Sequence, residues 1–263
     1  IINLVSILPS NYEDEVLADC TDDLNRAATG FDSGLEDTKL ALTAISDDGF
    51  VVETKSAYAP EMLTAFIKLN GATVGVVANR TKVYDDNMEV VAEYEPKLTA
   101  NGCDKAAQFV YFCDDFSIPV LTLTNATGFK ACKCQEKRGA KATARLTYAF
   151  ASATVPKVNV IIGEAFGSAY VTMNSKSIGA DMVFALPTAK VGMMDANAAA
   201  KIMYAKEIEE DASVLAEKTA EYAQLQGSVT KAASRGYVDN IVEPVDVRKY
   251  VIGALEMLYT KRQ

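Results

Sequence analysis

Short runs rich in β-branched and apolar residues alternate along this chain with segments of helical character, and this alternation limits the fold more than any other feature. It is typical of an α/β protein, in which helices cover a sheet. The predicted strands are 50–54, 73–78, 119–124, 155–162 and 182–185. The predicted helices are 60–69, 104–116, 140–152, 169–178, a long one from 196 to about 225, and 245–259. We expect residues 24–263 to form one domain without an internal repeat.

The strands at 119–124 and 158–162 are apolar or β-branched at nearly every position, which is typical of central strands buried on both faces. Hydrophobic residues make up 49% of the 263 residues, enough to build a large core. No stretch approaches the ~18 consecutive apolar residues of a membrane helix. We therefore expect a soluble protein.

The sequence contains no histidine, which removes many kinds of active site. A Ser/His/Asp triad, a Cys/His dyad, a His-ligated zinc ion and a histidine general base are all excluded. Catalysis would have to use carboxylates, lysine, tyrosine, thiols, backbone amides or a cofactor. The formal charge of −9 argues against general nucleic-acid binding.

Five cysteines, an odd number, are spread along the chain without a CxxC pair. This pattern favours free thiols in a reducing cytoplasm over a zinc site or a disulfide framework. We expect no metal site, no signal peptide and a cytoplasmic protein. The cysteines are Cys20, Cys103, Cys113, Cys132 and Cys134.

The chain begins with apolar residues and lacks both an initiator methionine and a polar lead-in, which favours a fragment of something longer. An acidic stretch with six carboxylates follows from Glu13 to Asp23 and is typical of a solvated linker or a charged surface. We predict that residues 1–23 are a linker or the tail of a preceding domain.

The stretch most informative about chemistry follows the predicted strand 158–162 and runs from Gly163 to Tyr170. Its small residues at 167–169 lead directly into a predicted helix. The first N–H groups of a helix have no partner within it, and small side chains let a ligand oxygen reach them. The sequence thus allows an anion pocket here, although small residues at such a turn also serve close packing.

A second turn, 125–129, ends the predicted strand 119–124. Because ligands bind beyond the carboxyl ends of strands in open α/β sheets, both turns are expected to border one cleft. Residues 130–145 then carry six basic side chains and one acidic, a local charge of +5. This run either steers an anionic ligand toward the turn or forms a solvated loop and helix face. Cys132 and Cys134 lie within it and are either incidental or made reactive by neighbouring lysines.

A series of short motifs, specific in order and spacing, resembles one known family over nearly the whole chain. The motifs are Leu8-Pro9-Ser10-Asn11, Tyr58-Ala59-Pro60, Leu69-Asn70-Gly71, Val74-Gly75-Val76-Val77-Ala78-Asn79, Lys105-Ala106-Ala107-Gln108-Phe109-Val110, Phe112-Cys113-Asp114, Ile118-Pro119, Ala153-Thr154-Val155-Pro156, Gly167-Ser168-Ala169-Tyr170, Met173-Asn174-Ser175-Lys176, Gly179-Ala180-Asp181, Pro187-Thr188-Ala189, and Gly236-Tyr237-Val238-Asp239 with Pro244 and Arg248. The chain resembles the C-terminal half of the biotin-dependent acyl-CoA carboxyltransferases, the β-type subunits of propionyl-CoA carboxylase and its relatives.

This resemblance implies a crotonase-like ββα superhelix and the transfer of a carboxyl group between carboxybiotin and the α-carbon of an acyl-CoA such as propionyl-CoA. The chain would be the biotin-side half and would need an N-terminal half that holds the CoA ester. In the family the site forms where opposite domains of two subunits meet. The implied partners are a biotin carboxyl carrier protein, biotin carboxylase and further copies in a dimer-based oligomer, up to a hexamer.

The family's Gly-Gly-Ala-Tyr turn matches 167–170, and there the amides of the second and third residues hold the ureido oxygen of biotin. By this match the oxyanion hole is formed by the N–H groups of Ser168 and Ala169. Fixed N–H dipoles stabilise the charge that develops on that oxygen by roughly 3 kcal/mol per donor, and no histidine is required. The other implied contacts are with biotin, at Gly128, Phe129, Gly167 and Tyr170, and with the acyl group, at Val171.

The chain also departs from the family pattern. The turn that usually has the form Asp-x-Pro-Gly-Phe-x-Pro-Gly has other residues at 125, 127, 131 and 132, although Gly128 and Phe129 remain. Ser168 replaces a glycine, the basic run replaces a Gly-rich stretch, and residues near 82–95 resemble an insertion. These changes bear on the geometry of the biotin site.

Several alternatives stay open at the sequence level. One is the reverse reaction, in the carboxyltransferase subunit of a sodium-pumping acyl-CoA decarboxylase, and another is a non-catalytic assembly subunit. A hydratase or isomerase would need a paired acid and base near the turn, where Glu164 and Asp195 each supply only one carboxylate. Tyr170 and Lys176 are further acid or base candidates, but at a strand-to-helix junction a packed tyrosine ring with a bonded hydroxyl is favoured.

Overall fold

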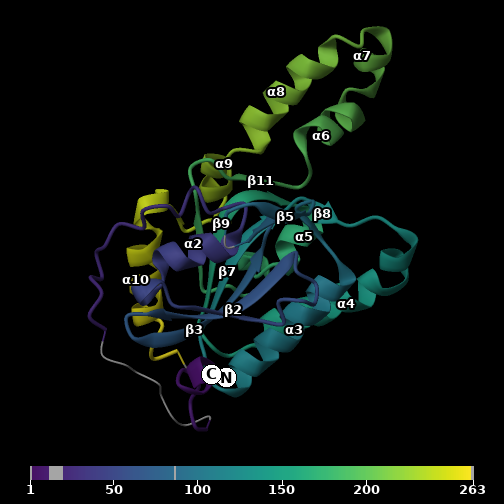
Figure 1. Cartoon of the computed structure of the whole chain (residues 1–263). Coiled ribbons are helices and arrows are strands. Elements are labelled where there is room, and N and C mark those ends of the chain that lie inside the picture. The colour runs from purple at the N-terminus through teal and green to yellow at the C-terminus, as the bar shows by residue number, and fades with distance from the viewer. Residues whose placement is uncertain (1, 12–19, 86, 262–263) are drawn as a thin grey trace.

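The computed structural model describes residues 2–11, 20–85 and 87–261 (Figure 1). The acidic stretch predicted as a linker lies mostly outside the described residues. All five cysteines are free thiols. Across the described parts of the chain, none of the helices combines the length and the apolar character needed to cross a membrane.

The centre of the molecule is a mixed sheet in the order β1-β2-β3-β7-β9-β10-β12, with β11 paired to the far end of β9. Strand β2 pairs antiparallel with both β1 and β3, and the pairs from β3 through β7, β9 and β10 to β12 are parallel. The strands are β1 (Val51–Thr54), β2 (Met62–Leu69), β3 (Ala72–Asn79), β7 (Val120–Ala126), β9 (Lys157–Phe166), β10 (Met182–Ala185), β11 (Lys190–Gly192) and β12 (Asn240–Ile241).

Two helical layers cover the sheet, as Figure 1 shows. On one face α2 (Thr38–Ile45) and α10 (Val247–Met257) pack through Leu42, Ile45 and Val251. On the other face α3 (Ala100–Asp115) and α4 (Lys133–Ser152) pack through residues such as Val110 and Leu146. The predicted α/β architecture is confirmed. The helices on each side bury both faces of the central strands, as their apolar sequences require.

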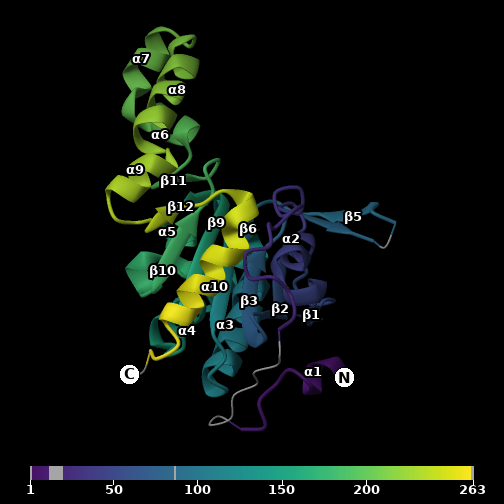
Figure 2. The same cartoon turned by 90° about the vertical axis from the view of Figure 1, so that its left-hand side faces the viewer.

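Smaller elements complete the chain. The remaining helices are α1 (Ile2–Val5), α5 (Gly167–Thr172), α6 (Ala196–Met203), α7 (Ala205–Glu210), α8 (Val214–Gln226) and α9 (Val229–Ser234). Single 3₁₀ turns occur at Asp47–Gly49, Lys176–Ile178 and Pro244–Asp246. Two short strand pairs lie outside the main sheet: β4 (Lys82–Tyr84) with β5 (Val90–Glu93), and β6 (Lys97–Leu98) with β8 (Gly128–Phe129). The segment 82–95, expected to be an insertion, thus contains a hairpin, which projects from the body in Figure 2.

The predicted helix at 60–69 is wrong, because this segment is strand β2. It pairs antiparallel with β3 through a two-residue turn in which Asn70 and Gly71 have φ values of 52° and 75°. Left-handed conformations at both positions are the form of hairpin turn that Asn-Gly favours. The turn therefore decides the conformation of a segment whose apolar residues also fit a helix.

The single long helix predicted from 196 to about 225 is also wrong, because α6, α7 and α8 are separate helices there. The backbone leaves the helical region at Asp211, with φ −144° and ψ 105°, and α8 folds back along α6. The ammonium group of Lys218 in α8 lies 4.9 Å from the centre of the Tyr204 ring, which stabilises this reversal.

Other boundaries shift in ways that affect the site. Strand β9 continues through Phe166, so Gly163–Phe166 is strand rather than turn, because β11 pairs with it there. The predicted helix 169–178 is broken after Thr172. Helix α4 begins at Lys133, which makes most of the basic run helical.

Candidate functional site

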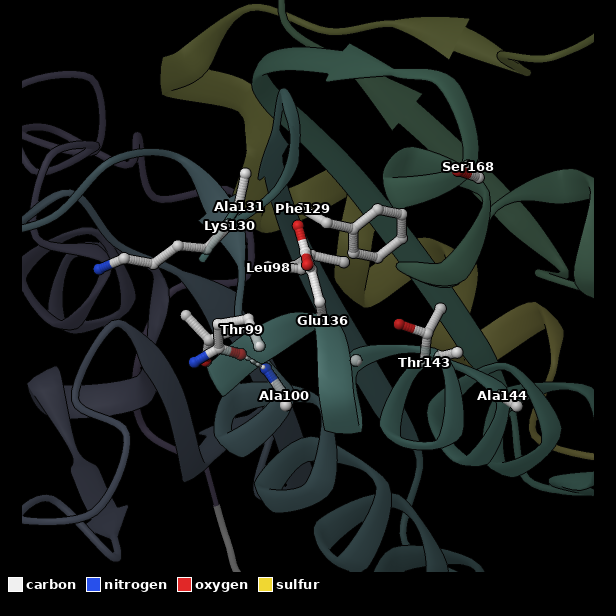
Figure 3. Close-up of a pocket in the computed structure, with 13 residues that line it drawn as sticks. Leu98, Thr99, Ala100, Phe129, Lys130, Ala131, Glu136, Thr143, Ala144 and Ser168 are labelled. Atoms are coloured by element: carbon white, nitrogen blue, oxygen red, sulfur yellow. Dashed lines mark hydrogen bonds between the residues drawn. The ribbon is translucent and has the colours of Figure 1, made fainter. Parts of the chain in front are cut away.

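A cavity of about 520 Å³ lies between the start of α3, the strand β8 with the loop after it, the first half of α4 and the start of α5 (Figure 3). Both strand-end turns singled out in the sequence contribute to it, through Phe129 and Ser168. The cavity is lined by Leu98, Thr99, Ala100, Phe129, Lys130, Ala131, Gln135, Glu136, Gly139, Ala140, Thr143, Ala144 and Ser168.

The turn from β9 into α5 has an unusual backbone. Gly167 has a φ of +58°, and a Cβ atom there would lie 2.9 Å from the carbonyl oxygen of Met193. Any other residue would be strained and crowded, so glycine is required for α5 to start where it does. Ser168 and Ala169 are the second and third residues of α5, so their N–H groups have no acceptor within the helix, and Ala169 is only 1% exposed. Of these two residues, Ser168 lines the cavity, whereas Ala169 follows it in α5 and is not among the lining residues.

Polar side chains from the central strands hold the chain that follows α5. The Thr124 hydroxyl donates to the Asn159 side-chain oxygen at 2.8 Å, and both residues also donate to the carbonyl oxygen of Met173, each at 3.3 Å. The side-chain amide of Asn174 donates to the Thr122 hydroxyl at 3.1 Å. These buried bonds fix the chain after α5 against β7 and β9, and thereby fix the position of α5.

The end of β7 is tied to β9 by Asn125, the residue that stands where the family has aspartate. Its side-chain oxygen accepts from the Glu164 N–H at 3.1 Å, and a Cβ atom on Gly163 would lie 2.7 Å from that oxygen. The strand register shifts between Thr124 and Ala126 at this point. The bulge directs the chain toward β8, which brings Phe129 to the cavity.

Helices α3 and α4 form the opposite wall. The Gln135 side-chain oxygen accepts from the Ala100 N–H at 2.6 Å, a bond drawn in Figure 3, and so joins the starts of the two helices. Thr99 caps α3 by accepting from the Gly102 N–H. Arg138 and Arg145 pair with Asp104 of α3, at 3.2 and 2.7 Å. Part of the basic run therefore serves helix packing, while Lys130 is one of the cavity-lining residues.

The structure brings together only some of the predicted site residues. Ser168 and Phe129 line the cavity, and Gly167 and Gly128 are their immediate neighbours. Val171 is half-buried and outside the lining, and its carbonyl oxygen accepts from the Ser175 hydroxyl at 2.9 Å.

Tyr170 also lies outside the cavity lining. Its ring is packed as expected, in a cluster with Val183 and Val229, and is 6% exposed. The expectation of a bonded hydroxyl is wrong, because the buried oxygen has no partner among the described residues. Burial raises the pKa of Tyr170 to about 12, so this hydroxyl is neutral and unsuited to acid or base work.

The other acid and base candidates have structural partners. Lys176 pairs with Asp239 at 2.7 Å, and Glu164 pairs with Lys190 at 3.1 Å. Asp195 caps α6 by accepting from the Ala198 N–H at 3.0 Å. These side chains stabilise the fold, and none of them lines the cavity.

Sequence reasoning missed several residues of the cavity, including Leu98, Thr99, Gln135 and Thr143. Gln135 follows the turn at 125–132 closely in sequence, so its proximity to that turn could have identified it as a cavity residue. The others reach the cavity through packing of α3 on α4, which no local pattern encodes. No group of three or more metal-ligating side chains is found in the described ranges.

The whole chain, residues 1–263, matches a family model described as the carboxyl transferase domain. The methylmalonyl-CoA carboxyltransferase 12S subunit of Propionibacterium freudenreichii subsp. shermanii is 38% identical over 231 residues, 86% of this chain and 42% of that protein. The methylmalonyl-CoA decarboxylase subunit alpha of Veillonella parvula is 36% identical over 99% of this chain and 50% of that protein. The propionyl-CoA carboxylase beta chain of Saccharopolyspora erythraea is 39% identical over 86% of this chain and 41% of that protein. This chain thus spans about half the length of these relatives.

Solved structures agree with the fold. A transcarboxylase 12S crystal structure superposes with a TM-score of 0.88 at 35% identity, over 99% of this chain and 50% of that one. The β subunit of a geranyl-CoA carboxylase from P. aeruginosa superposes with a TM-score of 0.72 at 22% identity, over 86% of this chain and 42% of that one. The crotonase-like fold implied by the sequence motifs is confirmed.

Proposed function

Because the chain belongs to the carboxyl transferase domain family, we propose that it is the biotin-side half of a carboxyltransferase that moves a carboxyl group between biotin and the α-carbon of an acyl-CoA. Propionyl-CoA and methylmalonyl-CoA are the acyl-CoA pair named for the relatives. The observation that carries the proposal is the pair of adjacent N–H groups at Ser168 and Ala169, which have no acceptor within α5 and lie at the helix start where Ser168 lines a cavity.

These two amides fit the carbonyl oxygen of a ureido ring. A strand end and a glycine in a left-handed conformation hold both donors in place before any ligand arrives. Such fixed dipoles stabilise negative charge without the cost of turning solvent or side chains toward it. Biotin, presented on a carrier protein, supplies the nitrogen that carries the carboxyl group. The proposal requires no general base from the chain, and it is therefore compatible with the lack of histidine.

The remaining site residues have supporting roles in this proposal. The Phe129 ring provides an apolar wall across from Ser168, as Figure 3 shows. A Cβ atom on Gly128 would meet nothing within 4 Å, so the backbone beside Phe129 is open, whereas Gly167 makes room for the Met193 carbonyl oxygen. Tyr170 anchors α5 in the core rather than touching the ligand. Val171 stays the predicted contact of the acyl group.

Partners complete the proposed enzyme. A half that holds the CoA ester, on the same or another polypeptide, is required because this chain covers only about half of its relatives. We also propose a biotin carboxyl carrier protein and biotin carboxylase as partners. We propose a homo-oligomer as well, since one matched structure is described as a hexamer.

The proposal is tested by carboxyl transfer from carboxylated biotin carrier to propionyl-CoA, with the chain combined with a CoA-side half. Ser168→Pro removes one N–H at the second position of α5, where proline is tolerated in a helix. We expect transfer to fall by about 10²–10³-fold, the typical effect of removing one oxyanion donor.

Ser168→Ala is the matched control, because it keeps the N–H and removes only the hydroxyl. Its transfer rate should stay close to that of the unchanged chain. Circular dichroism and urea unfolding check that both variants fold. Equal rates for the two variants would reject the amide assignment, and no transfer by the unchanged chain would favour a non-catalytic assembly role.

Transfer of the carboxyl group in the opposite direction, from the acyl-CoA to biotin, is a second candidate function. The relatives that align over 99% of this chain include two methylmalonyl-CoA decarboxylase alpha subunits, from Veillonella parvula and Propionigenium modestum. In that case the same amides would serve transfer from methylmalonyl-CoA to biotin. Co-purification with a multi-span membrane subunit would favour the decarboxylase, and co-purification with biotin carboxylase would favour the carboxylase.

A further inference from the structure

We propose that Cys132 and Cys134 form a redox-active dithiol beside the cavity, which closes to an intrachain disulfide by exchange with a low-molecular-weight disulfide. The two sulfur atoms lie 2.7 Å apart. Cys134 is exposed and Cys132 is half-buried, so a small disulfide can reach the pair. A bond of about 2.05 Å then needs only a small movement of the side chains.

The local backbone is suited to this reaction. Cys132 is the N-cap of α4 in an extended conformation, and Cys134 lies in the first helical turn. The carbonyl oxygen of Cys132 accepts from the N–H groups of Gln135 and Glu136, both at 2.9 Å. These bonds keep the two cysteines at a fixed separation, so the thiols meet without any rearrangement of the helix.

The surroundings favour a thiolate at Cys132. The thiol of Cys134, the Gln135 N–H and the charge of Lys130 together lower the pKa of Cys132. The pKa of Cys134 is raised, chiefly because its thiol donates to Cys132. These directions favour Cys132 as the attacking thiolate and Cys134 as the second thiol, since the thiolate is the reactive form.

The other cysteines differ in environment. Cys103 and Cys113 are buried in the α3 layer, and burial raises the pKa of both, for Cys103 to about 12. Cys20 is half-buried, and its thiol donates to the Asp22 carbonyl oxygen at 3.6 Å. In the described ranges, only 132 and 134 place two sulfurs in contact.

The exchange balances in two steps. The Cys132 thiolate attacks one sulfur of oxidised glutathione, which forms a mixed disulfide and releases one glutathione thiolate. Cys134 then loses its proton to solvent or to that thiolate, attacks the Cys132 sulfur and releases the second glutathione. The two protein thiols are oxidised, and one glutathione disulfide is reduced to two thiols.

The pair is placed to affect the cavity. Ala131 and Gln135, which flank it in sequence, both line the cavity, and Gln135 also holds the start of α3. The ring closed by the disulfide stiffens this turn. Thiol–disulfide exchange at this pair does not depend on the proposed function. Any effect of the disulfide on carboxyl transfer rests on the proposed function.

Peptide mapping tests the dithiol directly. The full chain is equilibrated without oxygen in buffers of oxidised and reduced glutathione, alkylated and digested with trypsin. Trypsin cuts after Lys130, Lys133 and Lys137, so the two cysteines fall on separate peptides, 131–133 and 134–137. We expect these peptides to be joined by a disulfide in oxidising buffer and separately alkylated in reducing buffer.

Cys132→Ser and Cys134→Ser should each lose the joined peptides, and Cys134→Ser should retain glutathione on Cys132. Cys20→Ser is the matched control and should leave the joined peptides unchanged. The proposal is overturned if Cys20 acquires glutathione under conditions where 131–133 and 134–137 stay unjoined, or if either cysteine pairs with Cys20 instead.

Discussion

Two fully buried cations differ in how well the fold compensates their charge, and so in their effect on the stability of this chain. Arg248 of α10 donates to Asp47 at 2.8 Å and lies 3.3 Å from Asp22, so its charge is compensated. Lys105 of α3 is 1% exposed, and its ammonium group donates to the Ala59 carbonyl oxygen at 3.3 Å. Desolvation lowers the pKa of Lys105 to about 8, and the nearby Glu53 compensates only in part. At neutral pH, folding therefore includes the free-energy cost of burying the charged Lys105 ammonium group. This cost disappears at high pH, where the group is neutral.

This penalty predicts a pH dependence of stability. Between the folded pKa of about 8 and the ordinary value of 10.5, the unfolded chain binds more protons than the folded one. Stability from this group is lost as pH falls through that window and is fully present above it. Relative to Lys105→Met, which cannot titrate, the unchanged chain should gain up to about 3 kcal/mol of unfolding free energy as pH rises from 7 to above 10.

Urea unfolding of both proteins across this pH range measures the difference. Lys39→Met, at an exposed position of α2, is the control: it retains Lys105, so its unfolding free energy should rise with pH in parallel with that of the unchanged chain. A difference between Lys105→Met and the unchanged chain that stays constant with pH would contradict the assignment.

At the scale of elements, the position of α5 depends on the buried segment that follows it. Asn174 is fully buried, has a φ of +54° and donates from its side chain to Thr122 and to the Val158 carbonyl oxygen. Asparagine serves both needs, because it tolerates the left-handed conformation and supplies two donors. The start of α5 is thus held by the strands beneath it as well as by Gly167.

Two substitutions at 174 separate these contributions. Asn174→Gly keeps the conformation and loses the hydrogen bonds, which should cost about 1–3 kcal/mol of unfolding free energy. Asn174→Ala loses the same bonds and adds left-handed strain, so it should cost roughly 1–2 kcal/mol more. Urea unfolding measures both values. Equal costs for glycine and alanine would mean that the backbone conformation at 174 relaxes without penalty.

At the scale of the whole molecule, α6, α7 and α8 form an arm that projects from the layered body in both Figures 1 and 2. Neither α7 nor α8 contains a buried residue, whereas α4 buries Leu146 and Phe150 in the core. Helical stability in proteins comes mostly from packing of an apolar face, so the arm has little to hold it in an isolated chain.

Hydrogen exchange should show this difference. In the isolated chain, backbone amides of 205–226 should exchange far faster than those of 142–152, although both segments are helical. Mass spectrometry of peptic peptides follows the two segments in one experiment. Protection of α8 equal to that of α4 would show that the arm is stable by itself.

The sequence alone determined the α/β class, the central strands, α3, α10 and the strand-to-helix junction near Gly167, because each depends on local pattern or on motifs of defined spacing. The placement of Ser168 and Phe129 at strand ends followed from the same patterns. Asn70-Gly71 was a local signal for the β2–β3 hairpin that the apolar character of 60–69 obscured.

Tertiary structure alone decided the rest. The break in the helical stretch after Met203, the extension of β9 to Phe166 and the unpartnered Tyr170 hydroxyl each depend on contacts with residues distant in sequence. Leu98 and Thr143 share a cavity only because α3 packs on α4. Local sequence sets the conformations that a segment can adopt, and the burial and pairing of that segment against others select one of them.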